Sequence, residues 1–456
     1  MSGEEWGEAL PRRATVRIPG ARSRALARRL TAVESRNITR IDEHGPIFWA
    51  EARGANVRDV DGNVFIDLTA GFAVAAAGHA NPRVAEAIAE QARRLPHALG
   101  DVHPPDVKVE LLERLAELAP GRLAVSILAS AGAEAVEAAL KTATMHTGRP
   151  GVLAFVGAYH GLTYGALAAT HREDFRAPFR GQLYGGVRFA RYPDPYRWEG
   201  TGDIAAAALL EVERLLDEAE ASDSPVGALL VEPIQGRGGI VVPPVEFLPG
   251  LRRICDARGL VLIMDEVYTG FGRTGRWFAC ERVGVVPDVL VAGKALTGAL
   301  PLSAAIGAPE VMAAWPPSSG EAIHTSTFLG NPLGCAAALA QLEEIERRGL
   351  VERAAALGAR LRRRLEEWAE RFDAVAEARG DGLLQAVELV EDARTKAPAT
   401  VVAERVARKA LQRGVLLLAE GPDANVLAFT PPLVITERQL DTALDVVEDA
   451  LLELVS

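Results

Sequence analysis

The stretch Leu260-Val261-Leu262-Ile263-Met264-Asp265 decides the fold class of this chain. An unbroken apolar run of this length is typical of a strand that is buried on both faces, as in a parallel sheet covered by helices. Residues 227–231 and 289–292 form further runs of this kind, and 151–155 forms a short one. A helical pattern at residues 135–147 precedes the first of these runs. This alternation predicts an α/β fold with a mainly parallel sheet.

An ionisable residue stands at or near the end of each of the runs 227–231, 260–264 and 289–292. Glu232 follows residues 227–231, Asp265 follows Met264, and Lys294 lies two residues beyond Ala292. In open α/β sheets, ligands bind at the carboxyl ends of the strands. We therefore expect a ligand site where these three residues meet.

The flanking sequences have a different character. An Asp-Gly step between alternating apolar residues predicts a β-hairpin over residues 56–67. Long, charged, amphipathic helical patterns begin after residue 335, and Thr436 with Gln439 fits a capping box that opens the last helix. We expect an N-terminal segment that packs with the small domain, a large cofactor-binding domain and a small C-terminal α+β domain, over residues 1–70, 71–335 and 336–456.

Composition excludes several classes of protein. Of 456 residues, 49% are hydrophobic and 24% are charged, which does not fit a disordered chain, a fibre or a disulfide scaffold. No stretch reaches the ~18 apolar residues of a membrane-spanning helix. The net charge of −11 argues against nucleic acid and anionic membranes as partners. The three cysteines lie far apart without metal-ligand spacing, so we expect a cytoplasmic protein with no metal site. We interpret the arginine-rich N-terminus as a solvated arm or surface helix.

Lys294 and Asp265 carry the most specific chemistry. A lysine directly behind a buried strand is costly unless its amine is neutralised or used, and a Schiff base with an aldehyde cofactor does both. A carboxylate at a strand end can keep a ring nitrogen protonated, as beside pyridoxal phosphate (PLP). Each residue alone also has an ordinary explanation: an exposed strand-end lysine, and a helix cap or salt bridge.

Three loops add weaker signals. Ser130-Ala131-Gly132-Ala133 precedes a good helix, and small residues there let backbone N–H groups reach a phosphate. In Tyr159-His160-Gly161, which follows a strand, the aromatic ring can stack on a flat ligand. Ser326-Thr327 offers hydroxyl groups in a loop. The ordinary alternatives are helix capping, core packing and turn formation, respectively.

Two patterns resemble binding motifs but lack their context. Residues 270–275 match G-x-G-x-x-G, yet they neither follow a strand directly nor open a clear helix, as a dinucleotide site requires. The sequence from Asp59 resembles the start of an EF-hand loop, but its twelfth position is Ala70 instead of a bidentate glutamate. We expect neither NAD nor calcium.

The order of the motifs is more specific than any single one. Glu232-Pro233-Ile234-Gln235-Gly236 is followed by Asp265-Glu266-Val267-Tyr268, then by Gly293-Lys294-Ala295, and then by Ser326-Thr327-Phe328 with Gly330-Asn331-Pro332. This series resembles the class III PLP-dependent aminotransferases, which include the ornithine, 4-aminobutyrate and ω-amino acid aminotransferases. The resemblance implies a PLP-dependent transferase of fold type I, normally a homodimer with its active sites at the interface.

The resemblance also implies roles for individual residues. Lys294 matches the Schiff-base lysine, and Asp265 matches the partner of the pyridine nitrogen. Val267 matches the residue beneath the cofactor ring, and Tyr159 the aromatic residue above it. Thr327 matches a phosphate ligand that the other subunit supplies. Further cofactor contacts are expected from Ala131, Gly132, Ala133, His160, Tyr268 and Ser326.

Departures from the family pattern bear on the substrate. The usual Gln after Asp-Glu-Val is Tyr268 here, and the Arg of ornithine and 4-aminobutyrate enzymes is Leu162. Many members have Glu where this chain has Arg237, and that Glu commonly pairs with a carboxylate-binding Arg, which is Ala428 here. Both familiar carboxylate-binding arginines are therefore missing. Arg237 is a candidate replacement or an ordinary ion-pair residue, and Phe72 matches an aromatic pocket position.

We expect a transaminase that moves an amino group from an amine or ω-amino compound to a keto acid or aldehyde, with Lys294 as the Schiff-base residue and as general acid and base. Ornithine and 4-aminobutyrate should be poor donors. A PLP-dependent racemase or epimerase on the same scaffold is the alternative, in which Lys294 returns the proton to the same carbon. A non-catalytic binding protein would have no need of Lys294 and Asp265 together.

Overall fold

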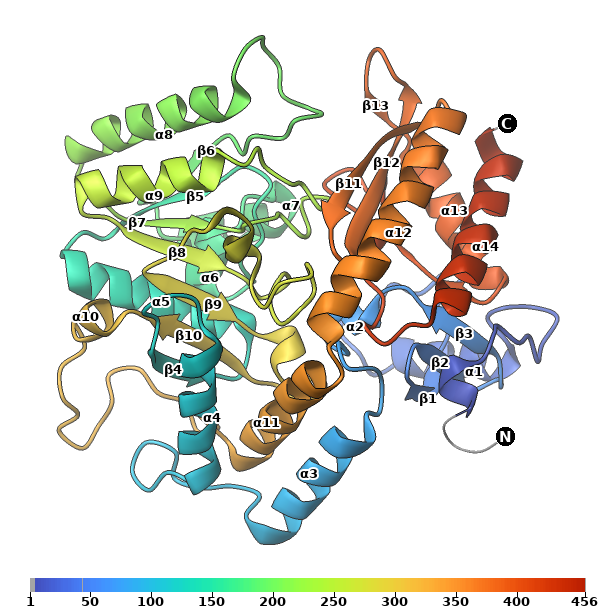
Figure 1. The fold of residues 1–456 in the computed structure, drawn as a ribbon, viewed down its shortest axis with the longest axis horizontal. Helices are drawn as coiled ribbons and strands as arrows, with labels where there is room; N and C mark the ends of the chain where they lie inside the picture. Colours follow the sequence, from blue (N-terminus) through green and yellow to red (C-terminus); the bar gives the residue numbers. More distant parts are fainter. Residues whose placement is uncertain (1–4, 43, 456) are drawn as a thin grey trace.

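A seven-stranded sheet forms the centre of the larger lobe in the computed structural model, which describes residues 5–42 and 44–455 (Figure 1). The strands from β9 to β6 run parallel, and β10 is antiparallel to both of its neighbours. The predicted α/β fold with a mainly parallel sheet is therefore confirmed. In sheet order the strands are β4 (Val125–Ala129), β10 (Ser303–Gly307), β9 (Val289–Ala292), β8 (Val261–Asp265), β7 (Val226–Val231), β5 (Gly151–Phe155) and β6 (Val187–Ala190).

The continuous apolar runs have a direct structural cause. Every residue of β5, β7, β8 and β9 is buried, because helices cover the sheet. Helix α5 (Gly132–Thr147) packs on β10 and β9, while α8 (Ile204–Glu220) and α9 (Phe247–Arg258) pack on the strands from β6 to β8. The other helices of this lobe are α2 (Ala70–Ala73), α3 (Pro82–Arg94), α4 (Asp106–Leu118), α6 (Tyr164–Ala169), α7 (Glu173–Arg176) and α10 (Pro309–Met312).

The smaller lobe is built on an antiparallel sheet in the order β11-β12-β16-β15, with β13 paired to β12. Helices α12, α13 and α14 lie beside this sheet (Figure 1). The elements are α12 (Leu350–Arg371), β11 (Val375–Asp381), β12 (Leu384–Asp392), β13 (Ala397–Pro398), α13 (Thr400–Gln412), β15 (Leu418–Glu420), β16 (Val426–Phe429) and α14 (Glu437–Val455). Helix α11 (Pro332–Arg347) precedes them and packs on α3 and α4 of the larger lobe.

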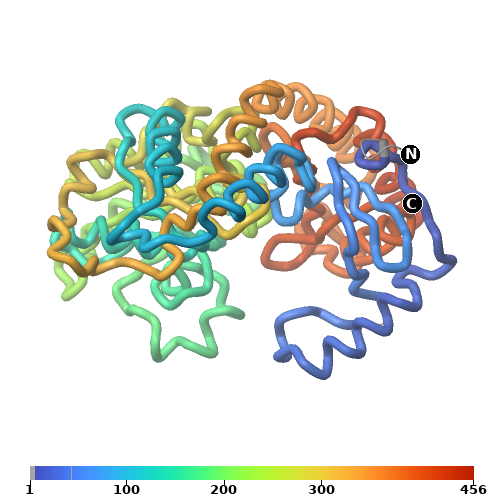
Figure 2. The backbone as a smooth tube through the Cα atoms, turned by 90° about the horizontal axis from the view of Figure 1, so that it is seen from below, coloured from blue at the N-terminus to red at the C-terminus, as the bar shows by residue number. Residues whose placement is uncertain are grey.

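The N-terminal segment joins the smaller lobe through a shared sheet. Strands β2 (Asn56–Asp59) and β3 (Val64–Asp67) form the expected hairpin, with β1 (Trp49–Arg53) at its edge. From the C-terminal part, β14 (Val415–Leu416) pairs in parallel with β3. The N-terminal segment and the C-terminal helices accordingly lie on the same side of the molecule (Figure 2).

The starts of helices α14 and α11 can be compared with those expected from the sequence. Thr436 and Gln439 exchange the hydrogen bonds of a capping box at the start of α14, as expected. Helix α11 begins at Pro332, earlier than expected, with the Asn331 side chain accepting the Gly334 N–H at 2.7 Å. Proline is tolerated in the first turn of a helix. The expected domain boundary at residue 335 thus falls inside α11, and the domain limits stay a prediction.

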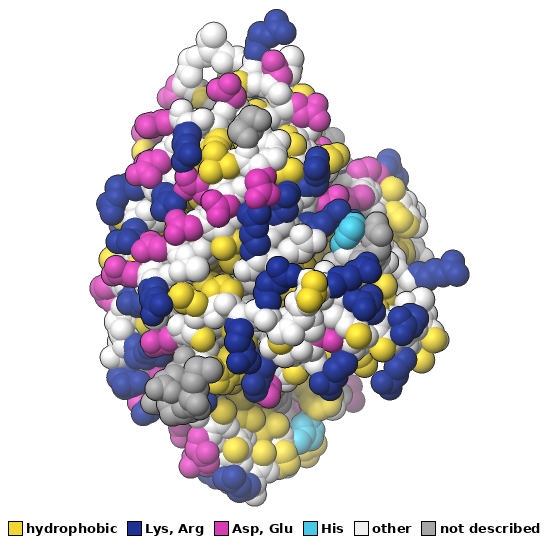
Figure 3. Space-filling model, turned by 90° about the vertical axis from the view of Figure 1, so that its right-hand side faces the viewer, with side chains coloured by type: hydrophobic (Ala, Val, Ile, Leu, Met, Phe, Trp, Pro, Cys, Tyr) yellow, Lys and Arg dark blue, Asp and Glu magenta, His cyan; other side chains and the backbone are white. Residues whose placement is uncertain are grey.

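Charged side chains of both signs cover the face that Figure 3 shows, with arginine and lysine prominent over its lower right part. Helix α1 (Ala21–Thr31) exposes Arg22, Arg28 and Arg29, which fits the interpretation of a surface helix. In the described part of the chain, no helix is both long and apolar enough to cross a membrane.

Candidate active site

A cavity of about 460 Å³ lies at the carboxyl ends of β7, β8 and β9. The three ionisable residues at the strand ends, Glu232, Asp265 and Lys294, all line it. The sequence-predicted site residues Gly132, Ala133, Tyr159, His160, Leu162, Arg237, Val267 and Tyr268 line it as well. The structure therefore brings together residues that lie far apart in the sequence, because parallel strands end at one edge of the sheet.

Lys294 is held in an unusual environment directly after β9. Its backbone φ is +45°, a left-handed conformation that costs a non-glycine residue roughly 1–2 kcal/mol. Its Nζ lies 4.3 Å from the centroid of the Tyr268 ring. Loss of solvent lowers the pKa of Lys294 to about 8; the charge of Arg237 acts in the same direction, while Asp265 and Glu232 oppose it. Such an amine is half neutral at about pH 8, so a useful fraction can act as a nucleophile or base near neutral pH.

Asp265 is fixed as a hydrogen-bond acceptor at the end of β8. Its Oδ2 lies 2.8 Å from His160 Nδ1, and its Oδ1 accepts the Val267 N–H at 3.1 Å. Both Asp265 and His160 are buried. The two contacts fix the orientation of the carboxylate, which can face a cationic nitrogen within the cavity.

The Glu232 side chain connects two loops of the cavity through hydrogen bonds. The sequence analysis did not predict this supporting role. Its Oε1 accepts the Tyr159 N–H and its Oε2 accepts the Gly236 N–H, both at 2.9 Å. Burial raises the pKa of Glu232 to about 7, with His160 opposing this shift and Asp265 adding to it. Its position at a strand end indicated that Glu232 belongs to the site. Nothing in the sequence indicates which distant backbone groups it binds.

The start of α5 points into the same cavity. Its N-cap residue Ala131 provides no side-chain cap, so the first N–H groups of this long helix lack side-chain acceptors. Gly132 is tightly placed, because a Cβ there would lie 3.1 Å from Val267 Cγ1. Unpaired N–H groups and the helix dipole together favour an anion at this position.

The remaining wall carries aromatic rings and a guanidinium group. The Arg237 guanidinium lies 5.0 Å from the centroid of the Tyr159 ring, and Arg237 Nε is buried without a hydrogen-bond partner among the described residues. The Tyr268 ring faces Lys294, while its hydroxyl hydrogen-bonds Thr430 of the smaller lobe. Burial raises the pKa of Tyr268 to about 12. Arg237 therefore brings a charged side chain to the cavity wall.

A family model described as aminotransferase class III matches residues 38–451. The chain belongs to this family. A 4-aminobutyrate aminotransferase of Mycobacterium tuberculosis is 38% identical over 448 residues, covering 96% of this chain and 97% of the relative. An alanine/serine racemase of Pyrococcus horikoshii is 36% identical over 445 residues, covering 96% of this chain and 92% of the racemase.

Solved structures agree with the family assignment. An amine transaminase from an uncultivated Pseudomonas species, in its PLP-bound form, matches with a TM-score of 0.86 at 31% identity, covering 92% of this chain and 98% of that one. The predictions of fold type I and of a class III aminotransferase are confirmed. The chain is thus an enzyme that transfers amino groups between small molecules. Among its described residues, no cluster of His, Cys, Asp and Glu side chains is suited to hold a metal ion.

Some of the predicted site residues of this aminotransferase lie outside the cavity. Phe72 is 54% exposed and does not line it, since left-handed backbone at Gly71 and Phe72 turns the chain there and Val74 takes a lining position. Ala428 is buried in a small apolar cluster against which Tyr268 packs. Ser326 and Thr327 lie exposed in the loop before α11. Their functional roles stay predictions.

Proposed function

We propose that this aminotransferase binds PLP in the cavity at the ends of β7, β8 and β9 and transfers an amino group from a primary amine or ω-amino compound to a keto acid or aldehyde. The observation that carries the proposal is that the Lys294 amine and the Asp265 carboxylate line one cavity with an uncapped helix start. The aldehyde, the ring nitrogen and the phosphate of PLP each have a matching group in this cavity.

The match is specific for each end of the cofactor. The N–H groups of Gly132 and Ala133 at the start of α5 would hold the phosphate. Asp265, fixed by His160 and Val267, would hold a proton on the ring nitrogen. Tyr159 would cover one face of the ring. When bound, PLP supplies an electron sink for the substrate carbanion.

Lys294 performs the proton transfers in this proposal. Its amine, with a pKa of about 8, is close to the value at which a general acid–base group works best near neutral pH. The Tyr268 ring beneath Nζ stabilises the protonated form by a cation–π contact. Lys294 thus takes a proton from the substrate carbon and delivers it to an atom other than that carbon. Asp265 keeps its orientation throughout.

Arg237 is proposed as the carboxylate-binding residue, in place of the two arginines that other members carry. It lines the cavity together with Leu162, and its planar guanidinium suits a carboxylate. Without the two usual arginines, recognition of ornithine and 4-aminobutyrate should weaken by roughly 2–5 kcal/mol for each buried pair that is lost. Neither Phe72 nor Ala428 lines the cavity, so the proposed recognition of a carboxylate depends on Arg237.

We further propose a cytoplasmic homodimer in which Thr327 of each subunit completes the phosphate site of the other, with Ser326 beside it. Exposed apolar side chains support an interface around this loop: Leu99, Ile323 and Phe328. The three cysteines of the chain are free and buried, which suits a reducing compartment.

The test is a panel of amino donors watched at the cofactor absorbance band. The proposal expects aminated cofactor to accumulate with a primary amine or ω-amino compound, and turnover to require a keto acid or aldehyde. A Lys294→Ala protein that turned over amines at the wild-type rate would refute the assignment of Lys294. Ornithine or 4-aminobutyrate as the best donor would refute the proposed substrate preference.

The second candidate function is racemisation or epimerisation, which the 36% identity to an alanine/serine racemase favours. Both reactions need the same proton transfer by Lys294. They differ in whether the proton returns to the substrate carbon. Incubation with one amino acid enantiomer and no acceptor distinguishes them, because a racemase yields the other enantiomer without aminating the cofactor.

A further inference from the structure

The turn that carries Arg237 is a strained segment shared by two cavities. Gly236 and Arg237 line the active-site cavity, whereas Gly238 lines a second cavity of about 330 Å³. The Gly236 carbonyl accepts the N–H groups of Gly239 and Ile240 at 3.0 and 3.1 Å. Ile240 has a φ of +54°, which is unfavourable for a β-branched residue. Contacts from outside the turn must therefore hold it in place.

Two side chains hold the turn from opposite ends. The Gly236 N–H donates to Glu232 Oε2 at 2.9 Å. The Gly239 carbonyl accepts from both Nε and Nη2 of Arg379 at 3.0 and 2.8 Å. A Cβ on Gly239 would lie 3.2 Å from Arg379 Nη2, so the guanidinium lies close against the backbone. Glu232 belongs to the larger lobe, while Arg379 comes from β11 of the smaller lobe.

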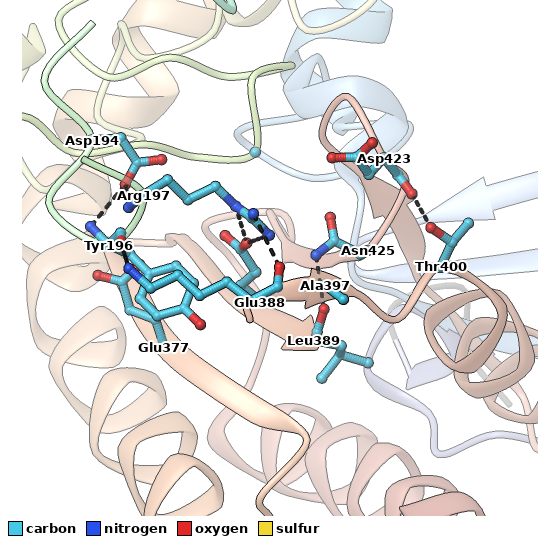
Figure 4. Close-up of polar contacts among 12 residues, drawn as sticks. Asp194, Tyr196, Arg197, Glu377, Glu388, Leu389, Ala397, Thr400, Asp423 and Asn425 are labelled. Carbon is cyan, nitrogen blue, oxygen red and sulfur yellow. Dashed lines mark hydrogen bonds and ion pairs between the residues drawn. The ribbon is translucent and has the colours of Figure 1, made fainter. Parts of the chain in front are cut away.

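Arg379 is itself locked in position by a buried charge network. Its Nη1 donates to Glu377 Oε2 at 2.8 Å and to Glu388 Oε2 at 2.5 Å. Arg379 and Glu388 are only 5% and 2% exposed. Glu388 also accepts from Arg197 Nε at 2.6 Å, and Figure 4 shows this pair reaching from the loop after β6 to β12. Because Nη1 is bound to two carboxylates, the Nε and Nη2 donors of Arg379 have one fixed orientation toward the Gly239 carbonyl.

We propose that Arg379 is a positioning residue for Arg237, and that it sets how strongly the enzyme prefers substrates that carry a carboxylate. It lines the second cavity and not the active-site cavity, so it acts through the turn. This inference rests on the proposed role of Arg237 as the carboxylate-binding residue. A bidentate contact to a carboxylate depends on exact placement of the guanidinium, and a shift of about 1 Å can cost as much as about 100-fold in rate.

The test compares Arg379→Lys with Arg197→Lys in the PLP-loaded enzyme. Lysine keeps a positive charge beside Glu388 in both variants, but at position 379 it cannot place two donors on the Gly239 carbonyl. Arg197 shares Glu388 but donates its Nη1 to the Lys396 carbonyl at 3.2 Å, so it is the matched control for a weakened network. Arg379→Gln serves as a second variant, and Arg237→Gln tests the underlying role.

The readout is the ratio of kcat/KM for a carboxylate-bearing donor to that for its methyl analogue. Suitable pairs are 3-aminopropanoate with propylamine and 5-aminopentanoate with pentylamine. We expect Arg379→Lys to lower this ratio by between about 10-fold and about 100-fold, mainly through KM, while Arg197→Lys leaves it within about twofold. A general loss of stability would lower both members of a pair equally.

The outcomes separate the two proposals. If Arg237→Gln lowers the ratio but Arg379→Lys leaves it unchanged, the positioning role is wrong and the role of Arg237 stands. If Arg237→Gln leaves the ratio unchanged, the carboxylate site lies elsewhere and both proposals fail. A ratio lowered equally by Arg379→Lys and Arg197→Lys would also refute the positioning role, because it would trace the effect to the charge network as a whole.

Discussion

The lowered pKa of Lys294 leads to a quantitative prediction about how fast the protein without its cofactor captures PLP. Only the neutral amine attacks an aldehyde. At pH 7, an amine with a pKa of about 8 is neutral in roughly one molecule in ten, whereas an ordinary lysine at 10.5 is neutral in roughly one in three thousand. Lys294 should therefore react roughly 300-fold faster at this pH than an ordinary lysine of equal nucleophilicity.

The charges around Lys294 fix the direction of two further shifts. The rate of capture should rise with pH and level off above about 8 in the unaltered protein. The Asp265 charge raises the pKa of Lys294, so Asp265→Asn should move the midpoint to lower pH. The Arg237 charge lowers that pKa, so Arg237→Gln should move the midpoint to higher pH.

Stopped-flow absorbance at the cofactor band measures these midpoints. Nα-acetyllysine mixed with PLP in the same buffers is the control, since it corrects for titration of PLP itself. A midpoint above 10 for the unaltered protein would refute the argument that burial lowers the pKa of this amine. Shifts of both variants in the same direction would refute the assigned electrostatic contributions.

Three other changes test the stability of the site and its fit to the cofactor. Lys294→Met should stabilise the cofactor-free protein by up to about 3 kcal/mol at pH 7, because a lysine whose pKa falls from 10.5 to about 8 on folding destabilises the fold below about pH 8. In urea unfolding this difference should shrink as pH rises from about 8 to about 10.5, and a constant difference would contradict the argument. Gly132→Ala should weaken PLP binding measured by equilibrium dialysis, because its Cβ would lie 3.1 Å from Val267 Cγ1; Gly185→Ala, which meets nothing within 4 Å, is the control and should bind normally. Glu232→Gln should cost about 1–3 kcal/mol in urea unfolding, since one of two buried N–H groups loses its acceptor, and an unchanged midpoint would show that the carboxylate is not needed there.

The sequence predicts those features of the fold that depend on local pattern. The buried strands were predicted because helices cover both faces of the sheet, which requires unbroken apolar runs. The meeting of Asp265 and Lys294 was predicted because parallel strands end at one edge. The capping box of α14 was predicted because its contacts span three residues.

Contacts between distant segments were not predictable in this way. Glu232 and Arg379 act on backbone groups of Tyr159, Gly236 and Gly239, and a backbone N–H or C=O has no sequence signature. The outward position of Phe72 depends on left-handed backbone at four consecutive residues, 70–73, which its residue type does not indicate. The family resemblance added residue roles but not these supporting contacts.

The central claim is that Lys294 is the residue that binds PLP covalently, and reduction with borohydride tests it most directly. The chain has five lysines: Lys108, Lys141, Lys294, Lys396 and Lys409. Borohydride reduces the C=N bond of the lysine–PLP linkage to a stable secondary amine, phosphopyridoxyl-lysine, which peptide mass spectrometry locates. We expect the adduct on the peptide that contains Lys294, at about one per chain. An adduct on any of the other four lysines, with Lys294 unmodified, would contradict it.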